Sequence, residues 1–335
     1  MHTQVPPHVV YDIDPDERVP LQNVLTARCD WGLYWCDKTG AQALVSHPAP
    51  QARQARGTEA ARQPTEPRSR ISLERSDRIM ARKLAFRRAG SGAPLLLLHG
   101  ALSDGREWRD QVAGLSDEFD VIAWDAPGCG GSDDDPPMTG MADYADAVAD
   151  LVAELGLESV QLCGLSFGGG LALAVYERHP GIVRSLVLAS AYAGWRGSLP
   201  PEEVEARRAR VHGDLDRPPA TWIDSYLPGF FAGPVPPETR DLVREIMLDV
   251  RPAGTRPMLD AFADADLRAV LPTITVPTLL IHGTADVRAP RPVVDALHAG
   301  IPHSELSLLP GVGHACNLEA PEAFNTELRR FLRSD

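Results

Sequence analysis

The stretch that decides the fold is Val160-Gln-Leu-Cys-Gly-Leu-Ser166-Phe-Gly-Gly-Gly-Leu171. Its apolar start predicts a buried strand over Val160–Cys163, and an apolar helix follows from Phe167. A serine on such a sharp strand-to-helix turn is strained and projects above the sheet. Glycine is needed at positions 164 and 168, because residues two before and two after the serine nearly touch. The stretch therefore predicts Ser166 as a nucleophile, with the positive end of a helix dipole beneath it.

Apolar runs and helical patterns alternate on both sides of this turn. Short continuous apolar runs are typical of strands covered on both faces, as in a parallel sheet. Alternation with helices predicts right-handed crossovers and a doubly wound, mostly parallel α/β sheet. We expect strands at about 71–76, 82–88, Pro94–His99, Asp120–Trp124, Val160–Cys163, Val183–Ala189, Thr278–His282 and Glu305–Leu309, and helices at about 107–115, 140–156, 167–178, 290–299 and 321–333.

One long interval, 191–267, has no strand pattern but contains helical stretches at Pro201–His212 and Pro237–Asp249. An insertion of this kind between two sheet strands predicts a helical cap. The expected organisation is an N-terminal extension at 1–70, a core in two parts at 71–190 and 268–335, and the cap between those parts.

The N-terminal extension differs from the rest of the chain in amino-acid composition. Ser46–Arg70 is rich in Pro, Ala, Gln and Arg, so it cannot bury enough apolar surface to order itself and is predicted to be a disordered linker. Val24–Val45 either forms a small hairpin or docks on the main body. It is alternatively upstream sequence before a later initiator at Met80, and residues 1–70 are alternatively an arm that binds a partner.

Charge excludes some classes of protein. The 335 residues carry a net charge of −13, and residues 1–80 are neutral, so the excess is all in 81–335. A nucleic-acid-binding protein needs a basic surface, and polyanionic substrates are also disfavoured. No apolar run is long enough to span a membrane. The first 30 residues contain Pro6, Pro7 and several aspartates where a secretory signal would be apolar, which predicts a cytoplasmic protein.

The five cysteines are odd in number and not closely paired, which predicts free thiols and no metal site.

A serine nucleophile needs a base, and the base needs an acid to orient it. His314 follows the last strand in Gly311-Val-Gly-His314, so it can reach back over the strand ends to Ser166. Asp286 follows the strand Thr278–His282 in Gly283-Thr-Ala-Asp286, again at a carboxyl end. We therefore predict a catalytic triad of Ser166, Asp286 and His314.

The oxyanion of the tetrahedral intermediate needs two N–H donors. The turn itself supplies the backbone N–H of Phe167, and the turn after the strand ending at His99 supplies that of Ala101. His99 is then a hydrogen-bonded structural residue. Aromatic side chains either wall an apolar substrate pocket or form a core of their own; the candidates are Trp108, Trp222, Tyr226, Phe230 and Phe231.

Five elements in order resemble the α/β-hydrolase superfamily across residues 71–335. They are His99-Gly100, Asp125-Ala-Pro-Gly-Cys-Gly-Gly-Ser132, Gly164-Leu-Ser-Phe-Gly168, Gly283-Thr-Ala-Asp286 and Gly313-His314. The resemblance is to the serine branch that holds enol-lactonases, small-ester esterases, C–C bond hydrolases and haloperoxidase-like perhydrolases. Epoxide hydrolases and haloalkane dehalogenases carry Asp where this chain has Ser166.

The resemblance implies a cofactor-free serine hydrolase that cleaves a small or medium ester or lactone through an acyl-enzyme. Cleavage of a C–C bond and perhydrolysis remain open, because the same triad performs them. A receptor with this fold that binds a small molecule and turns it over slowly is an alternative from another class. The physiological substrate and the oligomeric state are left open.

Overall fold

The computed structural model describes residues 83–134 and 138–333, together with the backbone of 34–36 and 42–44. The chain divides into two compact units, one up to Ala81 and the other from Arg82 onward. In the first unit, β1 (Tyr34–Cys36) pairs antiparallel with β2 (Gln42–Leu44), which is the pairing that a small hairpin requires. The predicted linker and the predicted strand at 71–76 lie outside the described residues.

The second unit is built on a seven-stranded sheet in the order β3-β5-β4-β6-β7-β8-β9. Neighbouring strands are parallel except β3 and β5, which are antiparallel. Because β5 lies on one side of β4 and β6 on the other, the winding reverses there, and a crevice opens at the carboxyl ends of β4 and β6. The strands are β3 (Phe86–Ala89), β4 (Ala93–Leu98), β5 (Phe119–Trp124), β6 (Val160–Leu165), β7 (Val183–Ala189), β8 (Thr278–Gly283) and β9 (Glu305–Leu309).

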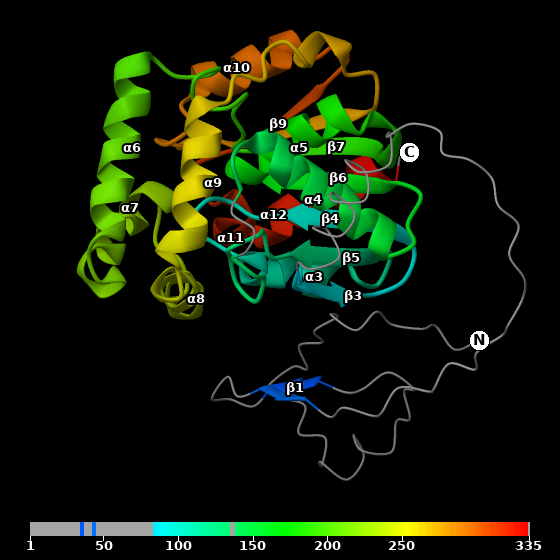
Figure 1. Cartoon of the computed structure of the whole chain (residues 1–335). Helices are drawn as coiled ribbons and strands as arrows, with labels where there is room; N and C mark the ends of the chain where they lie inside the picture. The colour runs from blue at the N-terminus through cyan, green and yellow to red at the C-terminus, as the bar shows by residue number, and fades with distance from the viewer. Residues whose placement is uncertain (1–33, 37–41, 45–82, 135–137, 334–335) are drawn as a thin grey trace, which may run out of the picture. The chain divides into compact units, whose positions relative to one another are not determined.

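Helices cover both faces of this sheet (Figure 1). On one face α3 packs against α12, and on the other α4 packs against α5. Proline at the first position of α12 favours the start of that helix, because no hydrogen bond is lost there. The helices outside the cap are α3 (Arg109–Leu115), α4 (Met141–Glu154), α5 (Phe167–Arg178), α10 (Arg291–Gly300), α11 (Cys316–Glu319) and α12 (Pro321–Leu332).

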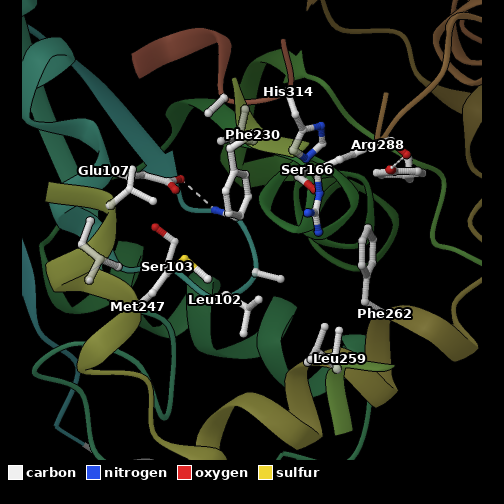
Figure 2. Close-up of a pocket in the computed structure, with 18 of the residues that line it drawn as sticks. Leu102, Ser103, Glu107, Ser166, Phe230, Met247, Leu259, Phe262, Arg288 and His314 are labelled. Atoms are coloured by element: carbon white, nitrogen blue, oxygen red, sulfur yellow. Dashed lines mark hydrogen bonds between the residues drawn. The ribbon is translucent and has the colours of Figure 1, made fainter. Parts of the chain in front are cut away.

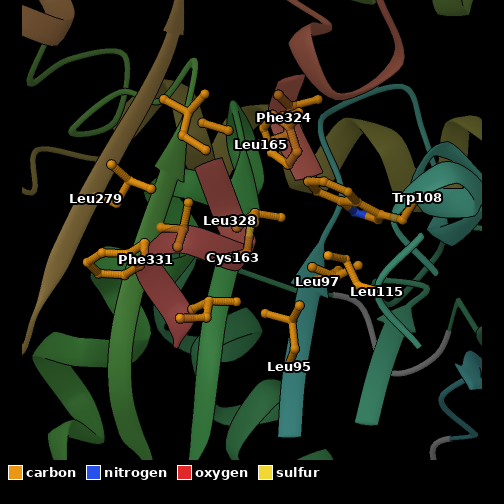
Figure 3. Close-up of a cluster of buried hydrophobic side chains, with 14 of the residues drawn as sticks. Leu95, Leu97, Trp108, Leu115, Cys163, Leu165, Leu279, Phe324, Leu328 and Phe331 are labelled. Atoms are coloured by element: carbon orange, nitrogen blue, oxygen red, sulfur yellow. The ribbon is translucent and has the colours of Figure 1, made fainter. Parts of the chain in front are cut away.

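The hydrophobic core between the sheet and the helices α3 and α12 follows from alternation along each strand. Leu95 and Leu97 of β4 point to this face, as do Cys163 and Leu165 of β6. Figure 3 shows these side chains against those of the two helices. Each large apolar side chain buried in this way contributes about 1.5–3 kcal/mol, so this face anchors the strands whose ends carry the site. The helical side of the cluster includes Trp108, Leu115, Phe324, Leu328 and Phe331.

The cap lies between β7 and β8 in the chain, as predicted, and its helices gather at one side of the sheet (Figure 1). Its longest helices are joined by polar contacts: His212 Nε2 lies 2.9 Å from an oxygen of Asp260, and Arg208 donates to Asp264 at 2.5 Å. The cap helices are α6 (Pro201–Leu215), α7 (Leu227–Phe230), α8 (Pro237–Leu248) and α9 (Pro252–Asp264), with 3₁₀ turns at Pro219–Thr221 and Ile223–Ser225.

The predicted α/β class is confirmed, and two element boundaries need correction. The helix expected at 107–115 begins as a 3₁₀ turn, Gly105–Trp108, and is α-helical only from Arg109, because Asp104 caps the turn by accepting from the N–H of Arg106. The strand expected at 82–88 is shorter and shifted, at Phe86–Ala89. Among the described residues, no helix is long and apolar enough to cross a membrane.

Candidate active site

Ser166 occupies the turn between β6 and α5. Its φ of 54° lies in the left-handed region, which a residue other than glycine seldom adopts without strain. Its N–H donates to the carbonyl of Ala189 at 2.9 Å. A Cβ at position 164 would stand 2.1 Å from the carbonyl oxygen of Gly168, and one at position 168 would stand 2.0 Å from that of Leu98. Glycine is therefore required on both sides of the serine, as expected from the sequence.

Asp286 and His314 form a buried pair at the ends of β8 and β9. The Nδ1 atom of His314 lies 2.8 Å from Oδ2 of Asp286. The other carboxylate oxygen accepts from the backbone N–H groups of Arg288 at 2.8 Å and Ala289 at 2.9 Å. Because a carboxylate only accepts, Nδ1 of His314 carries the proton and Nε2 is left as an acceptor. Ser166 and His314 line the same pocket (Figure 2).

Burial and pairing set the charges of these two groups. Burial lowers the pKa of His314 below its ordinary value, and the neighbouring carboxylate of Asp286 offsets this only in part. The imidazole is thus neutral at neutral pH, which is the form that can take a proton. Burial alone would raise the pKa of Asp286, but His314 and the two backbone N–H groups hold it below its usual range. The carboxylate is therefore ionised.

The loop after β4 supplies the opposite wall of the site. The N–H of Gly100 already donates to Oε1 of Glu107 at 2.8 Å, shown as a dashed line in Figure 2. The next residue, Ala101, lines the pocket. Phe167 is the first residue of α5, where the backbone N–H has no partner within the helix. The two predicted donors, Ala101 and Phe167, thus lie at the ends of β4 and β6, which are neighbouring strands.

His99 has the structural role expected for it. Its Nε2 accepts from the N–H of Ala126 at 2.9 Å, so its Nδ1 carries the proton and donates to the carbonyl of Gly100 at 2.8 Å. Both ring nitrogens are therefore occupied, and burial lowers the pKa of the ring.

Glu107, which the sequence analysis did not single out, is a pocket residue with an unusual charge state. The residue is only 5% exposed, and burial raises the pKa of its carboxyl group from 4.5 to about 8. At neutral pH the side chain is mostly protonated. No sequence signal predicts this, because the effect depends on how the loop after β4 is buried.

The pocket between the sheet and the cap is mostly apolar. Of the predicted aromatic residues, Phe230 lines it and stacks on the ring of His314 at 6.4 Å between centroids. Side chains that the sequence analysis did not assign to the pocket complete much of the wall: Leu102, Tyr192, Trp195, Met247, Leu259 and Phe262.

For the other candidate aromatics, the packing is that of the second alternative, a core of their own. Trp108 is fully buried on the sheet and packs against Phe324 at 6.1 Å between ring centroids, away from the pocket. Trp222 and Tyr226 pack on each other at 5.5 Å in the interior of the cap, where the Tyr226 hydroxyl donates to Asp214 at 2.7 Å. Phe231 is likewise buried outside the pocket lining. These residues stabilise the fold, because their rings lie inside a layer and not at its surface.

Two arginines also line the pocket, Arg207 from α6 and Arg288 from the loop after β8. Arg207 forms an ion pair with Glu203 at 2.5 Å. Sequence reasoning missed both, although Arg288 follows the predicted acid by only two positions. Within the described ranges, no group of three or more His, Cys, Asp or Glu residues is arranged to hold a metal ion.

A strained serine on a strand-to-helix elbow, a histidine–aspartate pair at later strand ends and a cap over a mostly parallel sheet define the α/β-hydrolase architecture. The model of the alpha/beta hydrolase family matches residues 95–327, and the chain belongs to this family.

Its relatives include esterases and a lactonase. The AB hydrolase superfamily protein YisY of Bacillus subtilis is 33% identical over 255 residues, which cover 73% of this chain and 93% of that protein. A thermophilic esterase from Thermogutta terrifontis is 30% identical with a TM-score of 0.70, covering 76% of this chain and 94% of its own. The enol-lactonase from Burkholderia xenovorans is 26% identical with a TM-score of 0.68, covering 75% and 97%. The protein is thus an α/β hydrolase related to esterases and lactonases.

Proposed function

We propose that the protein is a serine hydrolase of small or medium carboxylic esters or lactones, with Ser166, His314 and Asp286 as its triad. The observation that carries the proposal is the bond between Nδ1 of His314 and Asp286, which leaves Nε2 as a base in the pocket that Ser166 lines. The relatives that are esterases and a lactonase support the substrate class.

In the proposed reaction, Oγ of Ser166 attacks the carbonyl carbon of the substrate while its proton moves to Nε2 of His314. The N–H groups of Phe167 and Ala101 hold the oxyanion. When the intermediate collapses, the C–O bond to the alcohol breaks and the alkoxide takes the proton from Nε2. Water, deprotonated by the same nitrogen, then attacks the acyl-enzyme and releases the acid. The balance of this cycle needs no oxidant or further co-reactant.

The test measures turnover on p-nitrophenyl esters and lactones by the wild type and by the Ser166→Ala and His314→Ala variants. We expect many turnovers for each wild-type molecule and a loss of at least about 10³-fold in kcat in both variants. Ser190→Ala is the matched control, because Ser190 is another buried serine with a positive φ at a strand end but lies outside the pocket lining. Unchanged turnover in Ser166→Ala would overturn the mechanism, and a single stoichiometric release of product would favour a slow receptor.

A further inference from the structure

The backbone of Arg288 is fixed in place beside the triad. Its N–H donates to Asp286 at 2.8 Å. Its carbonyl accepts from the hydroxyl of Tyr192 and from the guanidinium of Arg207, the latter at 2.9 Å. Three polar contacts thus fix the backbone of Arg288, from which its side chain starts.

The side chain of Arg288 extends into the pocket between two rings of the cap. Its Cζ lies 4.7 Å from the ring centre of Phe230 and 5.6 Å from that of Tyr226. A Cβ at Gly229 would stand 3.3 Å from its Nη1, so the guanidinium also lies along the backbone of α7. Figure 2 shows the side chain reaching into the space that Ser166 and His314 line. Aromatic faces stabilise the cation but accept none of its N–H groups in the plane of the guanidinium.

Within residues 83–134 and 138–333, no carboxylate forms an ion pair with Arg288 and no group accepts from its guanidinium. Arg207, the other arginine of the pocket, is paired with Glu203. Burial lowers the pKa of Arg288 below its usual value, yet the guanidinium stays charged at neutral pH.

Neither Glu107 nor Asp286 accepts a hydrogen bond from the guanidinium of Arg288, although the negative charge of Asp286 acts to raise its pKa. Glu107 is mostly protonated at neutral pH, and Asp286 is committed to His314 and to two backbone N–H groups. The side chain is half-buried and its guanidinium faces the pocket without a counter-ion among the described residues, so an anion in the pocket could pair with it there.

We propose that Arg288 binds a carboxylate carried by the substrate, so that the pocket takes an ester or lactone with an anionic substituent close to the scissile carbonyl. A planar guanidinium presents two parallel N–H donors that match the two oxygens of a carboxylate. The net charge of −13 does not oppose this, because surface charges are screened beyond about 8–10 Å at physiological salt, whereas the guanidinium contacts the ligand directly. This proposal names the substrate class of the proposed hydrolase and rests on that function.

Two esters with acyl chains of equal length provide the test: p-nitrophenyl butyrate, which is neutral, and p-nitrophenyl hemisuccinate, which carries a terminal carboxylate. We expect Arg288→Met to lower kcat/KM for the hemisuccinate by about 10- to 100-fold more than it lowers kcat/KM for the butyrate. Arg288→Lys keeps the charge without the bidentate geometry, so its loss on the hemisuccinate should be intermediate. Equal losses on both esters, or no loss on the hemisuccinate, would overturn the proposal.

Arg291→Met is the matched control for the loss of one positive charge. Arg291 is exposed in α10 and pairs with Asp295 at 2.7 Å, outside the pocket lining. This variant should keep the wild-type preference between the two esters. A cooperative thermal transition of Arg288→Met shows that the variant is folded.

A binding experiment separates this proposal from the proposed function. Succinate should raise the Tm of Ser166→Ala protein, and it should raise the Tm of the Ser166→Ala/Arg288→Met protein less or not at all. If no ester is hydrolysed but succinate binds through Arg288, the hydrolase function fails and the anion site stands. If Ser166-dependent hydrolysis is found but neither preference nor binding depends on Arg288, the anion site fails and the function stands.

Discussion

Replacing Glu107 by glutamine should stabilise the protein at alkaline pH. Glu107 is 5% exposed, and burial raises the pKa of its carboxyl group from 4.5 to about 8. Between these two pH values the native protein holds a proton that the unfolded chain has lost. The free energy of unfolding therefore falls as the pH rises from about 4.5 to 8. At about 1.4 kcal/mol for each pH unit, ionisation of this one group costs up to about 5 kcal/mol.

Glutamine is close to glutamate in shape, and its Oε1 can still accept from the N–H of Gly100, at 2.8 Å in the wild type. It has no charge to bury, so its free energy of unfolding lacks this pH dependence. The assay is urea unfolding of the wild type and Glu107→Gln at several pH values between 5 and 9. Near pH 5 the two should be within about 1 kcal/mol of each other.

Toward pH 9 the wild type should lose several kcal/mol relative to the variant. Glu202→Gln is the control, because Glu202 is exposed on α6 and its loss removes one negative charge from the surface. Curves for wild type and Glu107→Gln that run parallel from pH 5 to 9 would refute the assignment of a protonated carboxyl group to this position.

Two further predictions follow from the elbow and from the base. Gly168→Ala should lower the free energy of unfolding by about 3 kcal/mol or more, because the new Cβ would stand 2.0 Å from the backbone oxygen of Leu98. Gly181→Ala is the control and should not lower it, because a Cβ there meets nothing within 4 Å. Equal stability of the two variants in urea would contradict the packing argument. Because burial lowers the pKa of His314, kcat/KM should stay constant as the pH falls to 6.5 and decline only below it. A decline centred above pH 6.5 in the pH–rate profile would show that the imidazole is not held neutral.

Much of the fold could be predicted because buried parallel strands are short continuous apolar runs. The bounds expected for Val183–Ala189 and Glu305–Leu309 are those of β7 and β9. Every candidate triad residue directly follows a predicted strand, and parallel strands place their carboxyl ends along one edge of the sheet. Position in the chain alone was therefore enough to expect Ser166, Asp286 and His314 at the same edge.

The pocket residues could not be predicted in the same way, because their roles depend on which layer each side chain faces. Trp222 and Phe230 are both aromatic residues of the cap, yet one is buried inside it and the other stacks on His314. Trp108 packs against Phe324, which is more than 200 positions away in the sequence. Periodicity within one segment contains no information about such distant partners.

The charged residues of the pocket have properties that depend on how each side chain is buried and paired. On the side of β4, Glu107 is a carboxyl group kept mostly neutral at neutral pH, so it adds little negative charge near the proposed oxyanion site. On the side of β8, Arg288 keeps its positive charge without a carboxylate partner among the described residues. An acidic protein thus has a pocket whose wall includes an arginine outside any ion pair of the described residues, with Ser166 in the same wall and apolar side chains around it. A substrate with a carboxylate at one end and an apolar remainder would place the carboxylate at Arg288 and the remainder against the apolar side chains. Its orientation would then be fixed before any bond to the serine forms, which is the condition for efficient attack on its carbonyl carbon.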